Sequence, residues 1–117
     1  MTTPQQDLYT LLSNASGVTA LVSTRITPSI ASQNTALPYI TFELASTVNT
    51  NQVASNVKLA AHSRIQINCW ADNPDTATAV ADAVEAALTT GYVEFRREDR
   101  DPDTENFRTL LDWKIWK

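Results

Sequence analysis

The only cysteine and the only histidine of the chain lie close together in sequence, at positions 69 and 62. A thiolate activated by an imidazole would be the centre of a cysteine hydrolase, and such a pair must approach within about 3.2 Å. Residues 59–71 alternate in polarity as a β-strand does, which places Cys69 and His62 on opposite faces and about 23 Å apart. Cys69 is therefore expected to be a small apolar core residue, and His62 a surface or interface residue.

Residue counts disfavour other catalytic and metal-binding arrangements. With Gly17 and Gly91 as its only glycines, the chain cannot build a glycine-rich phosphate loop. One cysteine and one histidine cannot supply the four ligands of a structural zinc site. Acidic residues alternate in "DRDPDTEN" (residues 99–106) like the start of a calcium loop, but no glycine occupies the sixth position and Pro102 interrupts the turn. The sequence therefore predicts no enzyme active site, no metal centre and no cofactor.

Composition limits the classes of partner. The chain has 117 residues, of which 43% are hydrophobic and 19% charged, as expected for one domain (residues 1–117) with a single core. Its net charge of −4 argues against nonspecific nucleic-acid binding, which needs a basic surface. No run is apolar enough to span a membrane, and "MTTPQQDLYT" lacks the features of a signal peptide.

Three segments have the apolar spacing of helices. In "TPQQDLYTLLSN" (residues 3–14), Thr3 suits the N-cap and Pro4 the first helical position, ahead of a stripe formed by Leu8, Leu11 and Leu12. This helical segment is expected to end at Gly17. A short helical pattern with Val18, Leu21 and Val22 follows it. In "NPDTATAVADAVEAALTTG" (residues 73–91), Asn73 suits the N-cap, and the apolar stripe consists of Ala77, Val80, Ala81, Val84 and Leu88.

The remaining segments are expected to be extended. "TRITPSIA" (residues 24–31) is interrupted by Pro28, and the polar "TVNTNQVASN" (47–56) is a loop or an extended hairpin arm. Alternating strands are predicted within residues 37–46, 59–71, 92–98 and 107–117. The order helix, helix, strand, strand, strand, helix, strand, strand predicts an α+β fold. Its sheet should be mainly antiparallel, with about four to five strands and helices packed on one face.

Charged and aromatic residues outside the expected core are candidates for contacts between subunits. Trp113 shares its strand face with Leu111 and Ile115 and is expected in the core. Trp70 and Trp116 lie on the opposite faces of their strands, where either an interface or covering helices would bury them. The polar segment 47–58 could form an arm that contacts a neighbouring copy. The segment 95–106 carries both charge signs and could pair with a neighbouring copy. The candidate interface residues are Asn49, Thr50, Asn51, Gln52, Trp70, Arg96, Arg97, Glu98, Asp99, Arg100, Asp101 and Trp116.

The order of these segments resembles that of the small tail-completion proteins of long-tailed bacteriophages and prophages. The resemblance rests on "LYTLLSNASGVTALVSTRITPSIASQNTALPYITFELAS" (8–46), "RIQINCWADNPDTATAVADAVEAAL" (64–88) and "LLDWKIW" (110–116). A leucine-rich first helix, "GVTALV", "LPY" and a "CWA" strand entering an alanine-rich helix occur in the order typical of that family. Residues 46–58 and 99–106 match nothing in the pattern.

The resemblance implies a structural virion protein without catalysis or cofactor. Such proteins form a ring of identical subunits, generally a hexamer, at the head-proximal end of the tail tube. The ring stops tube polymerisation and joins the head connector, and DNA passes through its lumen without specific binding. Two alternatives are an assembly factor that leaves before the virion is complete and, from the residues alone, a small hydrolytic or ligand-binding domain around His62, Arg64 and Trp70.

Overall fold

The computed structural model describes residues 4–23, 25–28, 37–52, 57–102 and 106–116, and at 4, 46–52, 57–62 and 116 it describes the backbone alone. Helices α1 (Pro4–Ser13), α2 (Ser16–Val22) and α3 (Pro74–Ala87) occur with strands β1 (Ile26–Pro28), β2 (Tyr39–Gln52), β3 (Val57–Ala71), β4 (Tyr92–Arg100) and β5 (Phe107–Trp116). These elements follow one another in the predicted order.

The five strands form one mixed sheet in the order β1-β2-β3-β5-β4. The β1–β2 pair is parallel and the three other pairs are antiparallel. Strand β1 is short because Pro28, which cannot donate a ladder hydrogen bond, ends it. The predicted α+β fold with a mainly antiparallel sheet is confirmed.

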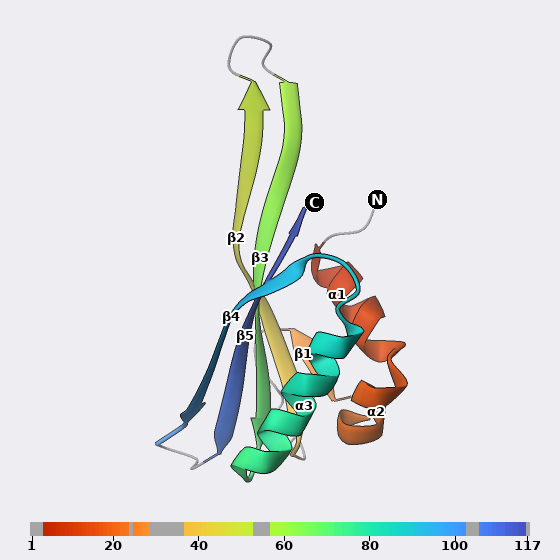
Figure 1. The fold of residues 1–117 in the computed structure, drawn as a ribbon, viewed down its shortest axis with the longest axis vertical. Coiled ribbons are helices and arrows are strands. Elements are labelled where there is room, and N and C mark those ends of the chain that lie inside the picture. Colours follow the sequence, from red (N-terminus) through yellow and green to blue (C-terminus); the bar gives the residue numbers. More distant parts are fainter. Residues whose placement is uncertain (1–3, 24, 29–36, 53–56, 103–105, 117) are drawn as a thin grey trace.

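The three helices lie on one face of the sheet (Figure 1). Helix α3 begins as predicted, because the Asn73 side chain accepts a hydrogen bond from the Thr76 backbone N–H at 2.8 Å. The prediction that a helix ends at Gly17 is wrong. Gly17 lies inside α2, and the chain instead turns at Ala15, which adopts an extended conformation (φ −88°, ψ 112°). Burial of Val18 and Val22 in the core, where α2 packs against α1 and α3, overrides the low helix propensity of glycine.

The core lies between the helices and the sheet. The predicted apolar stripes all contribute to it, and Trp113, as expected, is fully buried. Its indole N–H donates to the Thr90 carbonyl oxygen at 2.9 Å, so the one polar atom of the ring has a partner. The other fully buried apolar residues are Leu8, Leu12, Val18, Val22, Ile40, Ile65, Ile67, Cys69, Ala71, Val80, Ala81, Val84 and Leu111.

Strands β2 and β3 extend beyond the rest of the sheet as a two-stranded ribbon (Figure 1). The last β3–β5 pair is His62 with Trp116, whereas β2 and β3 continue to pair from Asn49–Ala61 to Gln52–Val57. We call residues 49–52 and 57–61 the arm. The arm contributes to an elongated molecule of 52 × 30 × 23 Å. Of the two predicted interpretations of segment 47–56, the extended arm is confirmed for 47–52, and 53–56 lie outside the described residues.

Candidate functional site

No described helix covers the second face of the sheet, which we call the open face (Figure 1). Strand register arranges its side chains in rows across β2, β3, β5 and β4. The first row is Tyr39, Trp70, Arg108 and Asp99; the second is Thr41, Asn68, Leu110 and Arg97; the third is Glu43, Gln66, Asp112 and Phe95.

The first row is a continuous network of side-chain contacts. The rings of Tyr39 and Trp70 stack with centroids 6.2 Å apart, and the Arg108 guanidinium lies over the Trp70 ring at 5.4 Å. The Trp70 indole N–H donates to Thr41 Oγ1 at 3.2 Å. Trp70, predicted at an interface, thus lies on the open face but is already held on three sides by its own sheet. It is a fixed part of a surface and not a free anchor.

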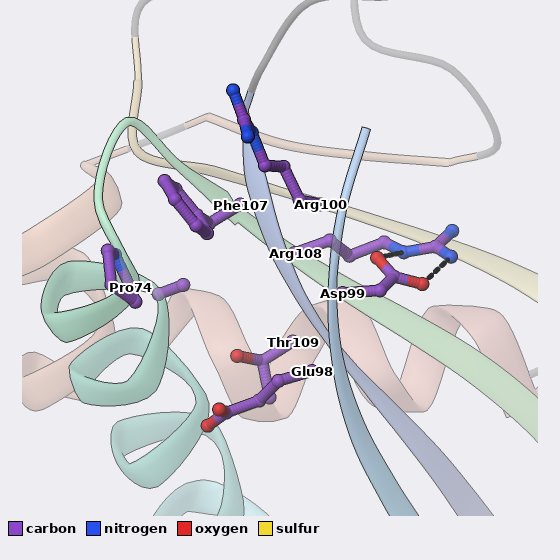
Figure 2. A pocket seen from close by; sticks show the side chains of 8 residues that line it. Pro74, Glu98, Asp99, Arg100, Phe107, Arg108 and Thr109 are labelled. Carbon is purple, nitrogen blue, oxygen red and sulfur yellow. Dashed lines mark hydrogen bonds and ion pairs between the residues drawn. The ribbon is translucent and has the colours of Figure 1, made fainter. Parts of the chain in front are cut away.

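Arg108 and Asp99 close the row at β4 through two hydrogen bonds, Nε to Oδ1 at 3.0 Å and Nη2 to Oδ2 at 2.5 Å (Figure 2). The hydrogen bonds from Arg108 lower the pKa of the Asp99 carboxyl, although partial burial opposes the shift. The same bonds raise the pKa of Arg108. Arg97 adds a third, weaker contact to Asp99 Oδ2 at 3.2 Å.

Arg96 points to the other side of the sheet, toward α3. Its Nη1 atom lies 2.9 Å from Asp82 Oδ1 and 2.9 Å from Glu85 Oε1. Partial burial opposes ionisation, but the hydrogen bonds to Asp82 and Glu85 outweigh it and raise the pKa of Arg96. Arg96 therefore ties β4 to α3 within its own chain, and its predicted role toward a neighbouring copy stays a prediction.

The other candidates in the mixed-charge segment also have neighbours in the same chain. Glu98 accepts a hydrogen bond from the Thr78 hydroxyl at 3.0 Å, and Arg100 lies over the Phe107 ring at 5.9 Å. The Asp101 backbone N–H donates to the Asn106 carbonyl at 2.8 Å. The Arg97 side chain is 57% exposed, compared with 28% for Arg96. Only the backbone is described for five further candidates, so their predicted interface role stays a prediction. They are Asn49, Thr50, Asn51, Gln52 and Trp116.

Two exposed aromatic residues on β4 were missed in the sequence. Tyr92 and Phe95 are 53% and 48% exposed. Their spacing predicts opposite faces, but a register shift between Val93 and Phe95 inserts an extra residue into β4. Tyr92 consequently pairs with Lys114 and Phe95 with Asp112, so both lie on the open face. A bulge of this kind leaves no clear signal in a short alternating segment.

The geometry supports no catalytic centre at Cys69. The residue is fully buried, and desolvation raises the pKa of its thiol to about 12. Cys69 pairs with Thr109 in the β3–β5 register and His62 with Trp116, so the two residues are far apart along β3. Within the described parts of the chain, no group of three or more His, Cys, Asp or Glu residues could hold a metal ion, and no helix there is long and apolar enough to cross a membrane.

A hollow of about 300 Å³ lies at the N-terminal end of α3 (Figure 2). Of its four charged residues, Glu98 and Arg100 are exposed, whereas Asp99 and Arg108 are half-buried and pair with each other. Thr109 Oγ1 is buried without a hydrogen-bond partner in the described part of the chain. This set has no nucleophile with an adjacent base. The lining consists of Pro74, Ala77, Glu98, Asp99, Arg100, Phe107, Arg108 and Thr109.

The site is therefore a surface and not a catalytic cleft, and a comparison with known families agrees with that description. The family model "Tail completion protein gp17" matches residues 6–117. The chain belongs to this family. The predicted family resemblance is confirmed. Membership of the family supports a structural role in phage tail completion.

The same fold occurs in a solved structure. One chain of a structure titled "Virion of native gene transfer agent (GTA) particle" superposes with a TM-score of 0.73. The two chains are 20% identical, and the match covers 93% of this chain and 90% of the other. At this identity the similarity establishes the shared fold. A search of curated proteins found no match to the sequence.

Proposed function

We propose that this protein forms a ring of identical subunits at the head-proximal end of the phage tail tube. The ring ends tube polymerisation and joins the tail to the head connector. The observation that carries the proposal is membership of the tail completion family across residues 6–117. The shared fold with a chain of a gene transfer agent virion supports a place in the finished particle.

The arm provides the reach that such a joint requires. Its two strands pair only with each other, and an isolated two-stranded ribbon is marginally stable in water. Of residues 49–61, only Lys58 is charged, so the arm carries little charge to desolvate on docking. We propose that the arm docks on the tail tube or on a neighbouring subunit when the ring joins the tube.

DNA must pass through the lumen of the ring during ejection. A net charge of −4 for each subunit offers no basic lining from which DNA would displace counterions. The protein therefore lets DNA pass without holding it. A gel-shift titration at physiological salt should detect no micromolar binding to duplex DNA.

Shortening the arm tests the role in joining. Val48 and His62 are a register pair, so replacing residues 49–61 by the dipeptide Asn-Gly leaves a two-residue hairpin loop between them. The free energy of unfolding should change by no more than about 0.5–1 kcal/mol, because the described residues of the removed segment pair only with one another. Particles from cells carrying this variant should include heads and tails that remain separate in electron micrographs.

The control is Lys58→Gln, which keeps the length of the arm and removes its only charge. It should assemble normally if length is what matters. Mass spectrometry of purified wild-type particles distinguishes a ring subunit from an assembly factor that departs. Absence of the protein from infectious particles would overturn the proposed function, and normal joining by the shortened variant would overturn the role of the arm alone.

A further inference from the structure

The third row of the open face differs from the first row in having no basic residue. In the first row, the Arg108 guanidinium lies over the Trp70 ring and forms two hydrogen bonds with the Asp99 carboxylate. The third row contains the same kinds of acceptor, carboxylates and an aromatic ring, without the cation. It consists of Glu43, Gln66, Asp112 and Phe95. The third row therefore lacks the charged donor that completes the first.

Neither carboxylate of the third row has a hydrogen bond or an ion pair with any described part of the chain. Glu43 is exposed and Asp112 is half-buried. Asp112 Oδ1 is itself buried, and a buried carboxylate oxygen without a donor is unfavourable. The row thus carries two negative charges that no described side chain neutralises by direct contact.

A buried amide in the second row adds another acceptor without a partner. Asn68 is 7% exposed, and its Nδ2 donates to Thr41 Oγ1 at 3.4 Å. The oxygen of the same planar amide points away from Thr41 and has no partner among the residues that the structure describes. Because Asn68 pairs with Leu110, Asp112 is its diagonal neighbour, about 7–8 Å away. A group with several donors can serve both acceptors.

The basic residues nearest to the third row belong to other rows. Arg97 bonds Asp99 at 3.2 Å and Lys114 bonds Glu94 at 2.9 Å. Arg64 precedes the third row by two positions on β3, is exposed and has no ion pair within the described ranges. Holding an exposed arginine costs side-chain entropy, so a pairing of Arg64 with this row would be weak. Arg64 is nevertheless a competitor that the test below includes.

We infer that the third row binds the guanidinium of an arginine side chain from a partner polypeptide. A guanidinium has five N–H donors, so it can donate two hydrogen bonds to the Asp112 carboxylate and offer another to Asn68 Oδ1. Its face can stack on the ring of Phe95, which is 48% exposed and is the register partner of Asp112. A partner's arginine would then make the kinds of contact that Arg108 makes in the first row.

The inference rests on the proposed function, because the partner is another protein chain of the particle. Arginine is favoured over lysine, since only the planar guanidinium combines a bidentate carboxylate contact with stacking on a ring. Neither carboxylate of the third row nor Phe95 was among the sequence candidates.

An NMR titration of the isolated protein tests the binding chemistry. N-acetyl-argininamide should shift the backbone amide signals of Gln66, Asp112 and Phe95 in a saturable way. N-acetyl-citrullinamide, which has nearly the same shape without the charge, should bind at least about fivefold more weakly. Asp112→Asn should remove the difference between the two probes. The matched control is Asp99→Asn, because that carboxylate already pairs with Arg108, and it should leave the difference intact.

Equal affinity for the two probes, or a preference that persists in Asp112→Asn, would overturn the inference. Arg64→Gln should leave the affinity for N-acetyl-argininamide unchanged. A strong rise in affinity would show that Arg64 already fills the third row of the free chain, and the inference would be wrong. Phe95→Leu should weaken binding of N-acetyl-argininamide by about two- to fivefold, and an unchanged affinity would overturn the stacking contact.

Photo-cross-linking in particles tests whether the arginine comes from a protein. Glu43→p-benzoylphenylalanine places a photoreactive group at the exposed end of the third row, and Ala79→p-benzoylphenylalanine on α3 is the control. Irradiation should link position 43, and not position 79, to a peptide of another chain that contains arginine. Cross-links to DNA alone, or none, in particles that contain the protein would overturn the partner. Absence of the wild-type protein from particles would overturn the proposed function, whereas the titration of the isolated protein judges the binding chemistry separately.

Discussion

The two faces of the sheet are stabilised by different kinds of interaction. The helix-covered face consists of apolar residues such as Ile67 and Trp113 that are fully buried, and its stability comes from close packing. The open face consists of rows such as Tyr39, Trp70, Arg108 and Asp99, held by stacking, cation–π contacts and charged hydrogen bonds. The first face determines whether the chain folds, whereas the second fixes side chains in a pattern that another molecule can meet.

The largest expected effect compares one tryptophan from each face. Trp113→Ala should destabilise by about 3–5 kcal/mol, because it leaves a cavity in the core. Trp70→Ala should cost about 1–2 kcal/mol, since it removes one hydrogen bond and one cation–π contact. Urea unfolding of both variants measures the difference, and equal losses would mean that the open face is as important to folding as the core.

Next in size is a backbone effect at the start of β4. Gly91 has a φ of +68°, and an added Cβ would collide with the Lys114 carbonyl oxygen. Gly91→Ala should therefore destabilise by about 1–3 kcal/mol. The matched control is Gly17→Ala, because an added Cβ there has no atom from outside its own helix backbone and chain neighbours within 4 Å. The free energy of unfolding should increase by up to about 1 kcal/mol, since alanine favours the helix. Thermal unfolding should move in opposite directions for the two variants.

Cys69 provides a smaller test of the helix-covered face. Cys69→Ala should cost about 1–2 kcal/mol and leave assembly intact, because the side chain only fills space in the core. Burial raises the pKa of the thiol to about 12, so a thiol reagent should modify the native protein slowly and the urea-unfolded protein quickly. Loss of function in a fully folded Cys69→Ala protein would contradict the structural role.

The smallest effect concerns pH and the open face. Because hydrogen bonds from Arg108 lower the pKa of Asp99, its contribution to stability is present above the unfolded pKa of about 3.9 and is lost as pH falls through the folded pKa. Asp99→Asn should therefore be less stable than wild type near pH 6, by about 0–1 kcal/mol, and equal to it near pH 2. A stability difference that stays constant with pH would assign the loss to packing and not to charge.

Much of the fold was predictable because its signals are local. The Asn73 cap, the stripe of Val80 and Val84, and the alternation around Cys69 all act within a few residues. The parallel β1–β2 pair, the placement of β5 between β3 and β4, and the β4 bulge depend on contacts between distant segments, which periodicity does not report. The site was predicted less well for the same reason. Arg96 looked like a surface charge until the fold placed Asp82 and Glu85 beside it, and Tyr92 and Phe95 share a face only through the bulge.

The position of β5 has a consequence for synthesis of the protein. Strand β5 (Phe107–Trp116) is the last described element, yet it joins β3 to β4 and brings Trp113 into the core. On the ribosome, the β2–β3 hairpin, α3 and β4 all emerge before β5, so the β5 side of β3 has no strand partner until β5 follows. The sheet closes only after β5 has left the exit tunnel, so a prematurely terminated chain exposes apolar surface and an unpaired strand edge. We therefore expect a chain that ends before β5 to aggregate or to be proteolysed, and not to contribute to the proposed ring.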